Sequence, residues 1–146
     1  MASITGSMPV AVSDTREDVA KLITRLTVSV LILFHCVSVL NGEQAIRDYL
    51  GMWGLPLWLA YTAALFEGIA PIMVILGVYA RVGALMMSFW MTMAFLLAHI
   101  TTGHIFQVNQ VGFWAVETPF FFLAMSFVVL LQGAGKYGLN IGGRWN

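Results

Sequence analysis

Residues 65–81 read LFEGIAPIMVILGVYAR, an apolar run that holds one carboxylate, Glu67, and ends at Arg81. With the apolar residues before it, the run is long enough to cross a membrane, which takes about 20 predominantly apolar residues in a helix. An ionisable side chain inside a bilayer is costly, so by default it marks a functional site. The stretch therefore predicts a membrane-spanning helix that carries a functional carboxylate.

The composition of the whole chain is that of a membrane protein. Hydrophobic residues make up 60% of the sequence and charged residues only 10%, whereas soluble globular proteins carry about 25% charged residues. The formal net charge is zero, which argues against nucleic-acid binding. The one cysteine, Cys36, has no partner for an intrachain disulfide. The sequence does not assign a role to Cys36 or to His104.

Apolar segments elsewhere in the chain extend this interpretation. Spanning helices are predicted at about residues 22–40, 57–79, 84–101 and 113–131. Between the first two, residues 43–54 place apolar side chains at helical spacing, which predicts a short amphipathic helix at the membrane interface. The expected fold is all-α: an integral membrane four-helix antiparallel bundle with an interfacial helix between its first two helices.

The basic residues predict how such a bundle is oriented. With four spans, Arg47 alone lies on one side, and the other basic residues lie on the opposite side: Arg16, Lys21, Arg25, Arg81, Lys136 and Arg144. Cytoplasmic segments carry the excess of Lys and Arg. We therefore expect a flexible cytoplasmic tail at residues 1–18, a membrane domain at 19–132 and a Gly-rich cytoplasmic tail at 133–146.

Each predicted span carries one ionisable residue, and these four residues form the candidate site. At about 1.5 Å per helical residue, all four lie in the outer half of the membrane, with one of them somewhat deeper than the rest. They are His35, Glu67, His99 and Glu117. An antiparallel bundle allows them to face a common axis. Pro71, four residues after Glu67, cannot donate to the carbonyl of residue 67. This free carbonyl favours a cavity beside Glu67, and a simple kink in the helix is the alternative.

The chain resembles the DoxX family of small four-helix membrane proteins. The residues that carry the resemblance are FHCVSVLNG at 34–42, the Glu67 segment at 65–81, AHITTGH at 98–104 and GAGKYGLN at 133–140. Carried over by position, Glu67, Arg81 and the Gly133–Gly135 pair match family positions, and the two histidines and Glu117 match more loosely. The resemblance implies a link to membrane oxidoreductase systems, including a thiosulfate:quinone oxidoreductase subunit in some members.

Three functions remain open at this stage. In the first, the chain is a subunit of a quinone-linked redox system in a bacterial or archaeal inner membrane. The headgroup would be bound by His35, Glu67, His99 and Glu117, with Trp90 beside the ring. Glu67 and His99 would transfer protons. Electrons would come from a redox partner protein, because the sequence holds no haem, flavin or iron–sulfur motif.

The second function is a site for a single Zn, Fe or Mn ion, ligated by the same two histidines and two glutamates. The third is a non-catalytic membrane scaffold or carrier, in which the polar residues only fix helix register. A homo-oligomer is compatible with all three. Whether the chain is itself an enzyme is left open by the sequence.

Overall fold

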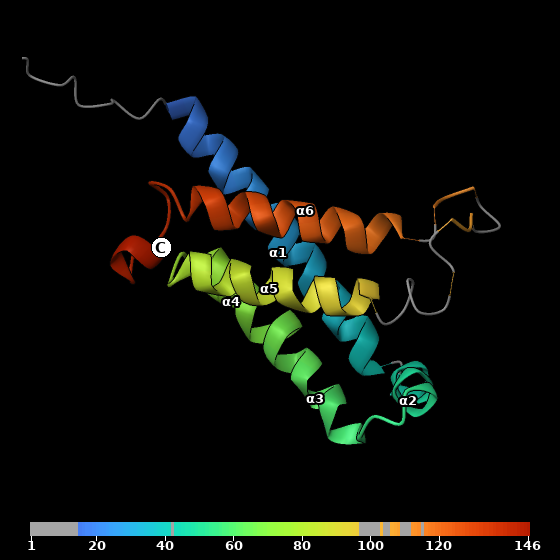
Figure 1. Ribbon diagram of the computed structural model, residues 1–146. Coiled ribbons are helices and arrows are strands. Elements are labelled where there is room, and N and C mark those ends of the chain that lie inside the picture. The colour runs from blue at the N-terminus through green and yellow to red at the C-terminus, as the bar shows by residue number, and fades with distance from the viewer. Residues whose placement is uncertain (1–14, 42, 97–102, 104–105, 109–111, 115) are drawn as a thin grey trace, which may run out of the picture.

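The computed structural model describes residues 15–41, 43–96, 103, 106–108, 112–114 and 116–146. All the main elements of the described residues are helices, as expected. Helix α1 (Thr15–Asn41) is the longest helix and begins with Glu17 and Asp18 in its first turn, where negative charge complements the helix dipole. Helix α2 (Glu43–Met52) follows almost directly and lies across the far end of α1 (Figure 1).

The segment that contains Glu67 is not one regular helix. It begins as a 3₁₀ turn, η1 (Leu57–Leu59), and continues as α3 (Ala60–Ala63). A π-helical segment, η2 (Ala64–Ile69), comes next, and α4 (Ala70–Leu76) completes it. α4 ends at Gly77, whose left-handed backbone (φ +67°) is a common C-terminal conformation of helices.

Helices α5 (Ala80–Phe95) and α6 (Glu117–Gln132) lie side by side, and α1 crosses them (Figure 1). Gly83 lets α5 approach α4 closely, because a Cβ at this position would lie 2.8 Å from the carbonyl oxygen of Ala70. Small residues at helix contacts are the usual means of close packing in membranes.

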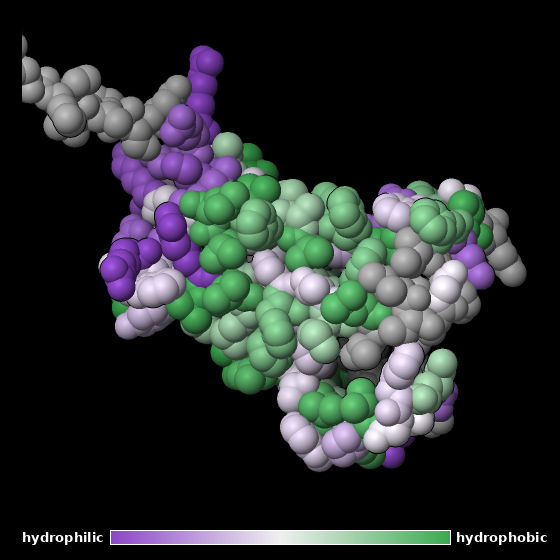
Figure 2. Space-filling model, in the orientation of Figure 1, coloured by the Kyte–Doolittle hydropathy of each residue, from purple (hydrophilic) through white to green (hydrophobic). Residues whose placement is uncertain are grey.

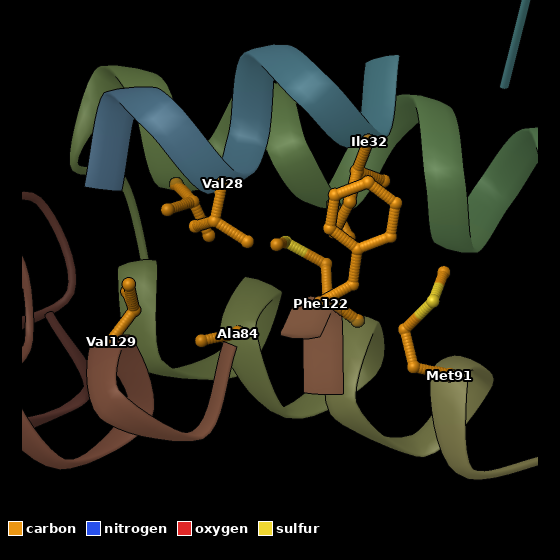
Figure 3. Packing of buried hydrophobic residues seen from close by; sticks show 9 residues of the cluster. Val28, Ile32, Ala84, Met91, Phe122 and Val129 are labelled. Atoms are coloured by element: carbon orange, nitrogen blue, oxygen red, sulfur yellow. The ribbon is translucent and has the colours of Figure 1, made fainter. Parts of the chain in front are cut away.

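The shared core lies between α1, α4, α5 and α6. Val28 and Ile32 of α1 point toward Phe122 of α6 and toward α5, where Met91 lies (Figure 3). All four side chains are at most 7% exposed. Many large apolar side chains outside this core are exposed instead, and Figure 2 shows them as a hydrophobic surface over the middle of the helices. A surface of this kind suits contact with lipid.

Two helices of the described chain are long and apolar enough to cross a membrane by length and composition: Thr15–Val37 and Leu57–Leu76. The described parts of the third and fourth predicted spans, α5 and α6, are shorter apolar helices of 16 residues each. The fourth was expected to start at residue 113. It starts at Glu117. Before it, Trp114 pairs with Val108 in an isolated antiparallel bridge, and Pro119 suits a first turn that needs no N–H donor.

The Gly-rich tail at 133–146 folds back onto the end of the helices. Tyr79 N–H donates to the carbonyl of Ile141 at 2.7 Å, and Leu139 N–H donates to that of Leu76 at 2.9 Å. The tail ends in a short 3₁₀ turn, η4 (Gly143–Trp145). In Figure 2 this end of the molecule is the most hydrophilic part of the view. The tail is therefore part of the fold rather than an extension from it.

Candidate functional site

Glu67 lies in the middle of η2, where the chain departs from α-helical geometry. The π-helical segment ends one residue before α4, and Pro71 stands in the first turn of that helix. Proline has no N–H to donate, so a regular α-helical ladder cannot run through this point. The chain instead forms a π segment before Pro71, a feature often found at functional sites.

The Glu67 carboxyl group is buried and is held by Trp90. The residue is 3% exposed, and Trp90 Nε1–H donates to its Oε1 at 2.6 Å. The indole also stacks on Phe66, with ring centroids 5.3 Å apart and an interplanar angle of 2°. Trp90 was expected to lie beside a bound ring. In the structure one face of its indole is covered by Phe66, and its N–H fixes the carboxylate.

His35 of α1 lies beside the same oxygen. Its Nε2 is 4.0 Å from Glu67 Oε1, too long for a direct hydrogen bond. The side chain is 44% exposed, and its ring lies 6.1 Å from that of Phe122. Because Glu67 is buried and His35 reaches the surface, His35 connects the carboxyl group with the outside of the helices.

The second oxygen of Glu67 has no hydrogen-bond partner. Glu67 Oε2 is buried and accepts no hydrogen bond from the residues that the structure describes. A buried acceptor left unsatisfied costs about 1–3 kcal/mol. The site therefore presents an unused acceptor beside a histidine that reaches the surface.

No contact of the other two predicted site residues with this cluster is recorded in the described part of the chain. Glu117 is exposed at the start of α6, where its charge complements the helix dipole. The predicted convergence of Glu117 with Glu67 and His35 stays a prediction. His99 and the loop residue His104 lie outside the described residues.

Within the described ranges, no group of three or more His, Cys, Asp or Glu side chains is placed to hold a metal ion. The metal alternative named His99 as one of its ligands, so it stays a hypothesis.

Sequence reasoning missed Phe66. Phe66 directly precedes Glu67, but its stacking on Trp90 depends on the rotation of two helices, which the spacing does not reveal. Cys36 is buried next to η2, and a Cβ at Gly68 would lie 3.8 Å from its sulfur. A buried, apolar thiol of this kind is usually a packing residue.

Comparison with known proteins gives one match. The model of the DoxX family matches residues 20–100, which include most of α1, the Glu67 segment and α5. Searches of curated proteins and of solved structures found no match.

Proposed function

The chain belongs to the DoxX family of membrane proteins, and on that premise we propose that Glu67, His35 and Trp90 bind the headgroup of a quinone or a similar lipid-soluble molecule. The observation that carries the proposal is the unused acceptor, Glu67 Oε2, buried beside the half-exposed His35. A quinol hydroxyl could donate the hydrogen bond that Glu67 Oε2 lacks. A quinol is soluble in lipid, so it could reach this oxygen through the bilayer.

The surrounding residues supply distinct parts of such a site. Trp90 holds one carboxylate oxygen at 2.6 Å, which leaves the other free to contact a ligand. His35 offers a ring nitrogen that can donate to or accept from the headgroup. A bound quinone would supply two-electron, two-proton redox chemistry. Glu67 and His35 would exchange protons with it, and a redox partner protein would exchange electrons.

The proposal includes a placement in the membrane. The helices form a four-helix antiparallel bundle, α2 lies at the interface, and both termini face the cytoplasm of a bacterial or archaeal cell. The distribution of basic residues supports this orientation. The site then lies in the outer half of the bilayer, with His99 and Glu117 as further candidates near the outer surface.

The test is quinone binding by purified protein that carries Glu67→Gln. This substitution keeps the size of the side chain and an acceptor for Trp90, but it removes the charge and the proton carrier. We expect the affinity for a short-chain quinol to fall about tenfold or more, the effect of losing a charge-assisted hydrogen bond. In the intact redox complex, quinone-dependent turnover is expected to be lost while the protein still folds.

Glu17→Gln is the matched control, because Glu17 is an exposed carboxylate whose recorded contact is with Lys21 at 4.0 Å. It should bind quinol like the wild type. Wild-type affinity and turnover in Glu67→Gln would contradict the proposal. A loss in Glu117→Gln as large as that in Glu67→Gln would show that the site extends to α6.

A further inference from the structure

Buried serine hydroxyls lie in the shared core between the helices. Ser29 of α1 and Ser126 of α6 are fully buried, and Ser88 of α5 is 7% exposed. Among the described residues, the Oγ atoms of these serines have no hydrogen-bond partner. A helical serine often donates to the carbonyl one turn before it, and a buried polar group without a partner is rare. We call Ser29, Ser88 and Ser126 the serine layer.

The three serines lie at one level of the core. Each has a buried residue on the same helix face one turn before it and one turn after it, because residues three or four apart share a face. Toward the end of the helices that the Gly-rich tail covers, the tail end, these neighbours are Arg25, Ala84 and Val129, and on the far side they are Ile32, Met91 and Phe122. In Figure 3 the labelled members of the two sets lie toward opposite ends of the cluster. The serines therefore lie between them.

The Glu67 site lies just beyond the serine layer, on the side away from the tail end. Ser88 is two residues before Trp90, which donates to Glu67, and this is about 3 Å of helix rise. Ser29 is six residues before His35, or about 9 Å. Glu67 Oε2, the unused acceptor, is thus the next buried polar atom without a partner in the described part of the chain.

On the side of the tail end, the serine layer meets a polar stretch of α1. Arg25, one turn before Ser29, is 1% exposed, and its Nε is buried without a partner among the described residues. Asp18, two turns before Arg25, is 4% exposed. The buried face of α1 is therefore polar from Asp18 to Ser29 and apolar beyond it, at Ile32. Polar groups follow one another from the tail end of the helices to Glu67.

Water is the usual partner of buried polar atoms that the protein leaves unpaired. A serine hydroxyl both donates and accepts a hydrogen bond. In a chain of water and hydroxyl groups, each hydroxyl can therefore release a proton on one side while it gains one on the other. Polar residues inside a membrane are costly and mark proton relays in pumps and transporters.

We propose that the serine layer, together with internal water, forms a proton path between Glu67 and the tail end of the helices. The inference rests on the proposed function of Glu67. When Glu67 gives its carboxyl proton to a quinone oxygen that has gained electrons from the redox partner, its carboxylate regains a proton from the path. The path regains one from the aqueous phase at the tail end. Arg25 keeps its own protons, because a guanidinium group stays charged in proteins, and its Nε–H orients a water oxygen.

The first test detects water in the serine layer and uses no quinone. In a Cys36→Ala background, Ser29→Cys and Ser126→Cys each place a thiol in the layer, and Val28→Cys places one in the apolar core, where Val28 is 0% exposed. Silver nitrate is added to inside-out vesicles in chloride-free buffer, and unblocked thiols are counted with a fluorescent maleimide after unfolding. We expect both serine positions to be blocked about tenfold faster than Val28→Cys, because a dry apolar core excludes an ion. Equal rates would overturn the proposal.

The second test measures proton delivery in the intact redox complex. The double variant Ser29→Ala/Ser126→Ala removes two hydroxyls from the path and none of the recorded contacts of Glu67. We expect quinone-dependent turnover to fall about tenfold, the lower range for a lost proton-transfer group, with a larger solvent deuterium isotope effect and unchanged affinity for a short-chain quinol. Thr27→Val, which removes an exposed hydroxyl of α1, should change neither turnover nor isotope effect.

Unchanged turnover in the double variant would overturn the proton path. A loss of quinol affinity in the same variant would also overturn it, because the serines would then belong to the ligand site. Failure of the proposed function is recognised separately: it appears as wild-type quinol affinity in Glu67→Gln and leaves the silver rates at the serine positions unchanged.

Discussion

The two carboxylate oxygens of Glu67 have different surroundings, and this difference defines the site. Oε1 accepts from Trp90 at 2.6 Å and lies 4.0 Å from His35, whereas Oε2 is buried without a partner. A carboxylate whose two oxygens both accepted hydrogen bonds from the protein would have a structural role. One with an unused oxygen beside a surface-reaching histidine is suited to a ligand.

The Trp90 hydrogen bond can be tested separately from ligand binding. Trp90→Phe keeps an aromatic ring on Phe66 but removes the N–H, so Oε1 of the buried carboxyl group loses its donor and neither oxygen is then hydrogen-bonded. We expect the free energy of unfolding in detergent to fall by about 1–3 kcal/mol. Trp58→Phe is the control, because Trp58 is 62% exposed and should leave stability unchanged.

A double-mutant cycle attributes the loss to this hydrogen bond. When Glu67→Met is combined with Trp90→Phe, the cost should be smaller than the sum of the two single costs, by about 0.5–3 kcal/mol. Strictly additive costs would mean that the indole stabilises the fold only through its contact with Phe66.

Helix by helix, the sequence predicted the order and approximate bounds of the elements better than their internal geometry. Residues 43–54 were expected to form a helix, and α2 spans Glu43–Met52; its interfacial position stays a prediction. The π segment at 64–69 was not predicted beyond a kink at Pro71, because periodicity alone does not distinguish a π turn from an α turn.

The π segment leads to a separate prediction about the orientation of Glu67. Pro71→Ala restores an N–H, which allows a regular α-helical ladder through residues 64–71. Removing the extra residue of a π turn would rotate Glu67 by about 100° relative to α4, since an α-helix has 3.6 residues per turn. We expect quinol affinity to fall about tenfold with no loss of helix content by circular dichroism.

Pro56→Ala is the matched control for this experiment, because Pro56 precedes η1 with ordinary extended angles (φ −68°, ψ 140°) and lies away from the site. It should leave quinol affinity unchanged. Unaltered affinity in Pro71→Ala would show that the orientation of Glu67 does not depend on the proline.

In the whole molecule, one buried side chain joins the first helix to the end of the chain. Arg25 of α1 is 1% exposed, and its two terminal nitrogens donate to the carbonyls of Ala134 at 2.8 Å and Tyr137 at 2.9 Å. Gly77 and Gly138 allow this contact, because a Cβ on Gly77 would lie 2.6 Å from the Cα of Gly138. The sequence placed Arg25 among the cytoplasmic charges but gave no sign of a partner about 110 residues away.

Arg25→Met should therefore release the tail without removing α1 from the membrane. Because charge-assisted hydrogen bonds to two carbonyls are lost, we expect trypsin to cleave after the exposed Lys136 about tenfold faster in inside-out vesicles. Right-side-out vesicles should protect this bond, since the tail is proposed to be cytoplasmic. Arg47→Met, at the opposite end of the molecule, should cleave like the wild type. An unchanged rate in Arg25→Met would contradict the role of Arg25 in holding the tail, and cleavage in right-side-out vesicles would contradict the orientation.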